Sequence, residues 1–206
     1  MDGKQHWESV YTEKAPHDVS WYCPHLERSL DFIDKARLNH DAHIIDVGGG
    51  SSTLVDDLLD RGYSNVTVLD ISSTAVDRAR KRLGPRAGDV TWRVGDITDV
   101  ELPRTHYDFW HDRAVFHFLT SEDARRKYVR AVRHALKIGG HIVVATFGPE
   151  GPERCSGLEV ARYSAEGLHA EFGETFSKMA SSLEHHVTPW GTEQEFVYCY
   201  CRMKPE

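Results

Sequence analysis

Three aspartates and a run of glycines stand where they could hold a nucleoside. Residues 48–50 are glycines that follow a short apolar segment containing Asp46, and Asp70 and Asp96 stand at the ends of the next two apolar segments. Glycines let the backbone turn tightly and let a ligand approach the main chain, and ligands of open parallel sheets bind beyond the carboxyl ends of the strands. One acid after each of three successive strands predicts a nucleoside site. The alternative is a plain turn followed by two helix caps.

The kind of nucleoside follows from what surrounds the glycine loop. A dinucleotide site requires the spacing G-x-G-x-x-G, but Thr53 stands where the third glycine would be. Such a site also holds a pyrophosphate at a helix N-terminus, and Asp46, just before the loop, would repel it. S-adenosylmethionine carries a sulfonium and an ammonium group and no phosphate, so it suits this acid.

From about Asp41 to Cys201 the chain resembles the class I S-adenosylmethionine-dependent methyltransferases, through the motif Asp46-Val-Gly-Gly-Gly-Ser51 and the acids that follow it. In that family the glycine motif wraps the methionine end of the cofactor. The acid matched by Asp70 binds the ribose, and the pair matched by Asp96-Ile97 holds the adenine. Ser52 departs from the pattern, because many members carry another glycine there. The resemblance implies cofactor contacts by Asp46, Gly48, Gly49, Gly50, Ser52, Asp70, Ile71, Asp96, Ile97 and His111.

The methyl acceptor is expected near the segment 108–119, Asp-Phe-Trp-His-Asp-Arg-Ala-Val-Phe-His-Phe-Leu, which crosses the end of the fourth predicted strand. Asp112, Arg113 and His117 are the candidate catalytic residues. His117 is the candidate base, because imidazole titrates near neutral pH. Alternatively, His111 and Asp112 only shape the cofactor pocket, while His117 satisfies a buried backbone group.

The N-terminal aromatics Trp7, Tyr11 and Trp21 are predicted to cover the cofactor. A similar W-x-x-x-Y opening precedes the glycine loop in small methyltransferases, and aromatic rings could exclude water and face the sulfonium. The alternative is that these residues anchor the first helix to the sheet. The stretch 147–163, rich in Gly and Pro, is expected to be a functional loop without structure of its own. Cys155 within it either lines the acceptor pocket or is a buried thiol.

Alternating strands and helices are needed to position these residues. Strands are predicted at 42–47, 66–70, 90–94, 107–111, 141–146, 172–187 and 194–202, and helices up to 38 and at 54–59, 72–83 and 122–136. The pattern predicts an α/β doubly wound, mostly parallel, seven-stranded sheet with an antiparallel C-terminal hairpin strand and helices on both faces. We expect one domain, 1–206, with a helical lid at 1–40 and a Rossmann-like core at 41–206.

Composition excludes several classes of protein. The 206 residues include 25 Lys and Arg against 32 Asp and Glu, a formal charge of -7 that disfavours phosphate-driven binding of nucleic acid. The Asn/Asp-Pro-Pro-Tyr/Phe motif of amino-methylating nucleic-acid enzymes is absent as well. The apolar runs are strand-sized and the N-terminus is polar, so neither a membrane span nor a signal peptide is predicted. Four cysteines without metal-ligand spacing predict reduced thiols, a cytoplasmic location and no metal site.

The sequence thus predicts a methyltransferase that uses S-adenosylmethionine and acts on a small-molecule acceptor, with a thiol or another soft nucleophile favoured. The alternative is a protein-lysine methyltransferase, whose basic substrate an acidic surface could meet. A nicotinamide-dependent oxidoreductase and a cofactor-binding module without catalysis stay open. We expect a monomer or weak homodimer with no nucleic-acid or membrane partner.

Overall fold

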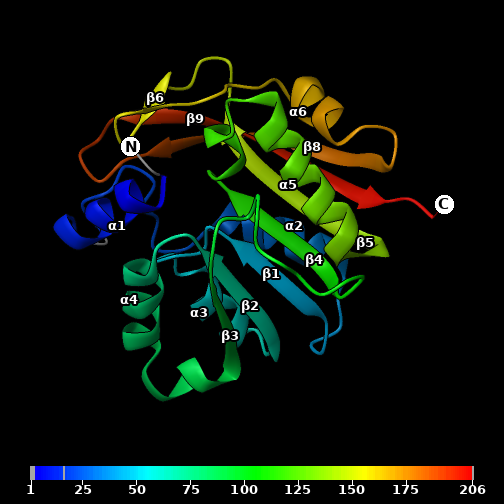
Figure 1. Ribbon diagram of the computed structural model, residues 1–206, viewed down its shortest axis with the longest axis horizontal. Helices are drawn as coiled ribbons and strands as arrows, with labels where there is room; N and C mark the ends of the chain where they lie inside the picture. The colour runs from blue at the N-terminus through cyan, green and yellow to red at the C-terminus, as the bar shows by residue number, and fades with distance from the viewer. Residues whose placement is uncertain (1–2, 16, 206) are drawn as a thin grey trace.

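Seven strands form one twisted sheet in the computed structural model, which describes residues 3–15 and 17–205. In spatial order the strands are β3 (Val90–Val94), β2 (Asn65–Asp70), β1 (His43–Val47), β4 (Tyr107–Arg113), β5 (Leu136–Phe147), β9 (Glu193–Met203) and β8 (Phe176–Val187) (Figure 1). Strand β9 pairs antiparallel with both β5 and β8, and the other pairs are parallel. The predicted mostly parallel sheet with a C-terminal hairpin is confirmed.

The strand order turns at β1. This strand pairs in parallel with β2 on one side and with β4 on the other, so Asp46 lies in register with Val68 and with His111. The chain runs outward from β1 to β3 and then returns to β4 on the opposite side. Ligands of doubly wound sheets bind at such a switch point, beyond the carboxyl ends of the strands.

Helices cover both faces of the sheet, as predicted. They are α1 (Gly3–Glu13), α2 (Glu27–Ala36), α3 (Leu54–Asp60), α4 (Ser73–Leu83), α5 (Glu122–Ala135) and α6 (Ala165–Phe172), with 3-10 turns η1 (Gly84–Asp89) and η2 (Phe116–Phe118). One core cluster packs the sheet against α5 and α6, and the other packs it against α2 and α3. Because strand side chains alternate, the neighbours Phe109 and Trp110 of β4 are fully buried in different clusters.

Serine side chains begin three of these helices. Ser72, Ser121 and Ser164 accept hydrogen bonds from the backbone N–H groups of Ala75, Ala124 and Gly167, which lie at the third positions of α4, α5 and α6. Such a cap contributes about 1 kcal/mol to helix stability. The cap of α4 matters most for the site, because this helix starts immediately after β2.

Two predicted strand starts are wrong. The strand predicted from Phe172 is preceded by helix α6, because Leu168 and Phe172 stand four residues apart and bury one helical face in the core. Gly173, with φ 70°, ends that helix, and β8 begins at Phe176. Strand β5 begins at Leu136 and not at 141, with a register shift against β4.

The stretch 147–163 is also more ordered than predicted. It contains a two-stranded hairpin of β6 (Arg154–Cys155) and β7 (Leu158–Glu159), with positive φ angles at the two turn residues between them. Within residues 3–15 and 17–205, none of the helices is long and apolar enough to cross a bilayer.

Candidate active site

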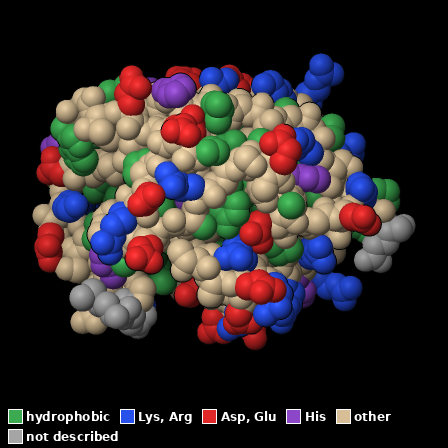
Figure 2. Space-filling view, turned by 90° about the horizontal axis from the view of Figure 1, so that it is seen from above, with side chains coloured by type: hydrophobic (Ala, Val, Ile, Leu, Met, Phe, Trp, Pro, Cys, Tyr) green, Lys and Arg blue, Asp and Glu red, His purple; other side chains and the backbone are tan. Residues whose placement is uncertain are grey.

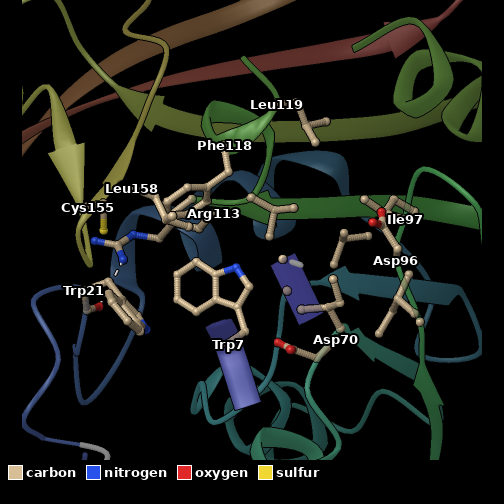
Figure 3. Close-up of a pocket in the computed structure, with 18 of the residues that line it drawn as sticks. Trp7, Trp21, Asp70, Asp96, Ile97, Arg113, Phe118, Leu119, Cys155 and Leu158 are labelled. Carbon is tan, nitrogen blue, oxygen red and sulfur yellow. Dashed lines mark hydrogen bonds between the residues drawn. The ribbon is translucent and has the colours of Figure 1, made fainter. Parts of the chain in front are cut away.

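A cavity of about 250 Å³ lies beyond the carboxyl ends of the first four strands of the chain. One side, here called the acidic side, is formed by Leu69–Ile71 and Gly95–Ile97, after β2 and β3. The other side, the aromatic side, consists of Trp7, Trp21, Phe118, Cys155 and Leu158. Figure 3 shows Asp70, Asp96 and Ile97 on one side, Trp21 and Cys155 on the other, and the Trp7 indole between them.

A second cavity of about 40 Å³ adjoins the first. The two cavities share Tyr11, Trp21, Gly48 and Arg113 as lining residues. The smaller cavity is also lined by the predicted cofactor residues Asp46, Gly49, Ser52 and His111. The fold therefore gathers all the predicted cofactor residues except Gly50 around two neighbouring cavities.

The glycine loop lets two carboxylates approach the backbone. A Cβ on Gly49 would lie 2.5 Å from Asp46 Oδ2 and 2.9 Å from Val68 Cγ1, and one on Gly50 would lie 2.5 Å from Asp70 Oδ2. Gly48 has φ 70°, a conformation that favours glycine. A side chain at Gly49 or Gly50 would push against the acids that line the cavities, and one at Gly48 would collide with Val115.

Asp46 is buried, and only one of its two carboxylate oxygens has a hydrogen-bond partner among the described residues. Its Oδ1 lies 2.7 Å from His111 Nδ1, and His111 Nε2 lies 2.8 Å from Ser29 Oγ. The arrangement is satisfied when Nδ1–H donates to Asp46 and Nε2 accepts from the Ser29 hydroxyl. Asp46 Oδ2 has no hydrogen-bond partner among the described residues. A buried, unpaired carboxylate oxygen is a site for a cationic donor.

Asp70 ends β2 on the acidic side. Its Oδ1 accepts a hydrogen bond of 2.8 Å from the Ser72 N–H. Burial, followed by the charges of Asp46 and Glu8, raises the pKa of this carboxyl to about 7. Asp70 is thus poised to accept hydrogen bonds from hydroxyl groups of a ligand in the cavity.

Asp96 and Ile97 form the far end of the acidic side. Asp96 Oδ1 accepts hydrogen bonds of 2.8 Å from both the N–H and the hydroxyl of Thr98, which fixes the carboxylate at the turn after β3. Ile97 is buried and presents an apolar surface to the cavity, and Ile71 lines the cavity beside Asp70. Together these groups offer an acceptor and a flat apolar wall, which fit a heterocyclic base.

Arg113 brings a cationic side chain to the site. It donates from Nε to the Tyr198 hydroxyl at 3.0 Å and from Nη1 to the Trp21 carbonyl at 3.1 Å, and its guanidinium lies over the Phe196 ring. Nη2 lies 3.4 Å from Glu184 Oε2. This guanidinium borders both cavities, so it can meet an anionic group in either.

Asp112 does not line either cavity. Because it alternates with Arg113 on β4, its carboxylate points to the opposite face, toward α5, and accepts a hydrogen bond of 2.6 Å from Tyr128 Oη. It also accepts from the Val115 and Phe116 N–H groups. Burial raises its pKa to about 6. These contacts of Asp112 hold the turn that brings Phe118 to the cavity wall.

His117 also lies outside both lining sets. It is fully buried, and its Nδ1 accepts a hydrogen bond of 3.3 Å from the Phe147 N–H. Burial, followed by the charge of Arg113, lowers its pKa to about 3. This placement favours the interpretation that His117 satisfies a buried backbone group.

The N-terminal aromatics line the cavity and also contact one another. The Trp7 ring lies 5.7 Å from the Trp21 ring and 5.0 Å from the Phe118 ring, both edge-to-face, and Tyr11 lies 6.3 Å from Trp21. Burial raises the pKa of the Cys155 thiol, which faces the same space, to about 11, so it is protonated at neutral pH.

Several residues at the site were not singled out from the sequence. Phe118 and Leu158 line the aromatic side, while Glu184 and Tyr198 hold Arg113. Apolar residues and strand tyrosines carry no motif, so only the three-dimensional fold brings them here. The W-x-x-x-Y pattern contains Glu8 but carries no signal for it.

Comparison with known proteins adds to this geometry. Residues 44–140 match a family model described as a methyltransferase domain. The chain is 20% identical over 200 residues to EEF1A lysine methyltransferase 2 of Homo sapiens, covering 90% of this chain and 77% of that protein. It also matches eEF1A lysine and N-terminal methyltransferases, of which the match spans 19–28% of the length.

Solved structures share the fold. A chain solved in work on the conversion of a disulfide bond into a thioacetal group during echinomycin biosynthesis superposes with a TM-score of 0.79 at 19% identity, over 98% of this chain and 92% of that one. The 1,6-didemethyltoxoflavin-N1-methyltransferase of Burkholderia thailandensis, with bound S-adenosylhomocysteine, gives a TM-score of 0.68 at 17% identity, over 98% and 84% of the two chains.

Fold, site and relatives agree on the class of protein. The chain is a class I S-adenosylmethionine-dependent methyltransferase, and S-adenosylmethionine is its cofactor. The unpaired carboxylate oxygen of Asp46 fits the ammonium group of that molecule, and the Asp70 carboxylate fits its ribose hydroxyls. The glycines at 48–50 leave room for the part that carries the sulfonium. This class replaces the nicotinamide oxidoreductase and the module without catalysis that the sequence left open.

Proposed function

We propose that this methyltransferase transfers the methyl group to a protein amine, the side chain of a lysine. The observation that carries the proposal is the aromatic side of the cavity. Trp7, Trp21 and Phe118 form a wall of three rings, and among the described lining residues that side holds neither a carboxylate nor a histidine. An aliphatic chain with a terminal amine fits such a wall.

The wall also has a chemical effect on the amine. An amine attacks only in its neutral form, and removal from water favours that form, because desolvation lowers the pKa of an ammonium group. Aromatic faces attract the cationic methylated product and the approaching ammonium. The rings therefore orient the acceptor and exclude water, and the proton leaves while the amine still contacts solvent.

The cofactor, once bound, supplies a methyl group on a positively charged sulfur that is a good leaving group. Asp70 would accept the ribose hydroxyls, and Asp96 with Ile97 would hold the adenine. Asp46 Oδ2 would accept a hydrogen bond from the ammonium group of the cofactor's methionine part, and Arg113 would pair with the carboxylate of that same part at the smaller cavity. Trp7, Tyr11 and Trp21 would cover the sulfur, while Asp112 and His117 would support the turn behind Phe118.

Relatives and surface charge support the lysine proposal. Curated relatives are named as lysine methyltransferases of eEF1A. The formal charge of -7 suits a basic protein substrate, because complementary charge steers association. The proposal departs from the small-molecule acceptor favoured from the sequence.

Methyl transfer to competing acceptors tests the proposal. The purified enzyme is incubated with S-adenosylmethionine and either eEF1A, a lysine-containing peptide or a panel of small thiols, and S-adenosylhomocysteine release and acceptor mass are measured. We expect lysine methylation of protein, abolished when the lysines of eEF1A are blocked by reductive alkylation beforehand. Rapid methylation of thiols without transfer to any lysine would overturn it.

A small-molecule thiol is the second candidate acceptor, favoured by Arg113. Its guanidinium borders the cavity close to Trp21 and Cys155 (Figure 3). A nearby fixed cation lowers the pKa of a thiol and increases the fraction of thiolate. The same acceptor panel decides between the two candidates.

A further inference from the structure

Glu8 connects helix α1 to the start of α4. Its Oε1 accepts hydrogen bonds from the Ser73 N–H at 2.6 Å and from the Ser73 hydroxyl at 2.8 Å. Its Oε2 accepts from the Ser72 hydroxyl at 2.9 Å and from the Thr74 N–H at 3.2 Å. One carboxylate from α1 thus receives four hydrogen bonds from the first turn of another helix.

These bonds complete the cap of α4. The Ser72 side chain accepts from the Ala75 N–H, and Glu8 accepts from the N–H groups of Ser73 and Thr74, so three N–H groups of the first turn are satisfied. A carboxylate is stabilised at a helix N-terminus by the helix dipole. Although desolvation opposes it, hydrogen bonds from Thr74 and Ser73 lower the pKa of Glu8 to about 2.

A second contact fixes the other end of α1. Arg78, farther along α4, donates from Nη1 to the Lys14 carbonyl at 2.5 Å, just past the end of α1. Figure 1 shows α1 lying beside the upper end of α4, and Trp7 and Tyr11 of α1 line the cavity. Helix α1 is therefore attached to α4 at two points.

The attachment joins the two sides of the cavity. Glu8 stands between Trp7 and Tyr11 on α1, and both of these rings line the cavity. Ser72, which donates to Glu8, also donates its N–H to Asp70 Oδ1 on the acidic side. The turn at Ser72 thus contacts both α1, which carries Trp7 and Tyr11, and Asp70, the proposed ligand of the ribose.

We infer that Glu8 is a positioning residue that docks α1 over the cavity and so slows the departure of the cofactor. Glu8 itself lines neither cavity, and it acts through Trp7, Tyr11 and the Ser72 turn. The inference rests on the methyltransferase class and not on the identity of the acceptor. It therefore stands or falls separately from the lysine proposal.

The dissociation rate of S-adenosylhomocysteine from the purified enzyme, measured by stopped flow, tests the inference. Loss of charge-assisted hydrogen bonds predicts that Glu8→Gln accelerates dissociation about tenfold, and Glu8→Ala more. Glu13→Ala is the matched control, because this exposed glutamate of α1 accepts a hydrogen bond from the Ser9 hydroxyl on the same helix and lines neither cavity, so its loss should leave the rate unchanged. An unchanged rate in Glu8→Gln, with the thermal midpoint also unchanged, would overturn the inference.

A second readout separates positioning from a general structural role. Because the Glu8 charge contributes to the raised pKa of Asp70, Glu8→Gln should move the pH midpoint of S-adenosylhomocysteine affinity to lower pH. A midpoint that stays in place would show that the Glu8 carboxylate does not act on Asp70 beside the Ser72 turn, which contradicts the inference.

Discussion

The acidic side and the aromatic side of the cavity are built in different ways. The acidic side comes from consecutive strand ends, with Asp70 after β2 and Asp96 after β3, next to the glycine loop after β1. The aromatic side is assembled from distant parts of the chain: Trp7 from α1, Trp21 from the segment after it, Phe118 from η2 and Leu158 from β7.

This difference separates the chemistry of the two sides. Parallel topology alone brings the strand ends together, so a class of cofactor can be held by a few local residues. The aromatic side depends on loops and on the N-terminal helix, which can vary without disturbing the sheet. The sheet therefore determines which class of cofactor is bound, and the segments that cover it determine which acceptor is methylated.

The largest expected effect comes from the glycine loop next to the acidic side. Gly49→Ala places a Cβ within 2.5 Å of Asp46 Oδ2 and 2.9 Å of Val68 Cγ1. The strain of such overpacking predicts a loss of S-adenosylhomocysteine affinity of about 100-fold by calorimetry. Gly88→Ala is the control, because a Cβ there meets no atom within 4 Å. Equal affinity in the two variants would contradict the described loop.

The next effect tests the ribose ligand. Asp70→Asn removes the charge that would accept the ribose hydroxyls, and loss of hydrogen bonds to a charged group predicts about 10-fold to 100-fold weaker binding of S-adenosylhomocysteine. Calorimetry at constant pH measures the change. Affinity within error of the unaltered enzyme would refute the assignment of Asp70.

Asp70 also predicts a pH dependence. With its pKa raised to about 7, the carboxylate ionises as the pH rises through that value, so affinity for S-adenosylhomocysteine should increase across the same window. In the cofactor-free protein the folded state binds more protons than the unfolded state between the ordinary pKa of 3.8 and about 7, so the free energy of unfolding should fall as pH rises through this window. Asp70→Asn should remove both slopes, and retention of either would point to a different group.

A smaller effect sharpens the role of the aromatic side. Trp7→Ala removes the ring that contacts both Trp21 and Phe118, and kcat/KM for the methyl acceptor should fall about tenfold, on the scale of a lost aromatic contact. Affinity for S-adenosylhomocysteine should fall less. The exposed Trp190, in the hairpin turn before β9, gives the control Trp190→Ala. A larger loss of cofactor affinity than of acceptor turnover would contradict the division into two sides.

The smallest effect on activity is expected at His117. His117→Phe leaves the buried Phe147 N–H without its acceptor, which costs about 1–3 kcal/mol of unfolding free energy in chemical denaturation. Turnover per folded molecule should remain, because His117 lies outside both cavities. If turnover fell while stability stayed constant, His117 would be the base that the sequence suggested.

The sequence predicts the acidic side better than the aromatic side, for a physical reason. Strand ends, glycine turns and carboxylates leave local patterns, so the sequence predicts Asp46 and Asp70 at strand ends and the mostly parallel seven-stranded sheet, although it does not give the order of the strands. The positions of Asp112 and Arg113 depend on strand alternation, which places neighbours on opposite faces and could have been applied to β4. The contact between Glu8 and Ser73 spans 65 residues and has no local signature.

A crystal structure of the enzyme with S-adenosylhomocysteine tests the central claim most directly. We predict the ribose hydroxyls on Asp70, the ammonium on Asp46 Oδ2, the adenine beside Ile97, and the sulfur facing the rings of Trp7 and Trp21. A ligand bound outside the two cavities, or one with Asp46 and Asp70 turned away from it, would contradict the account.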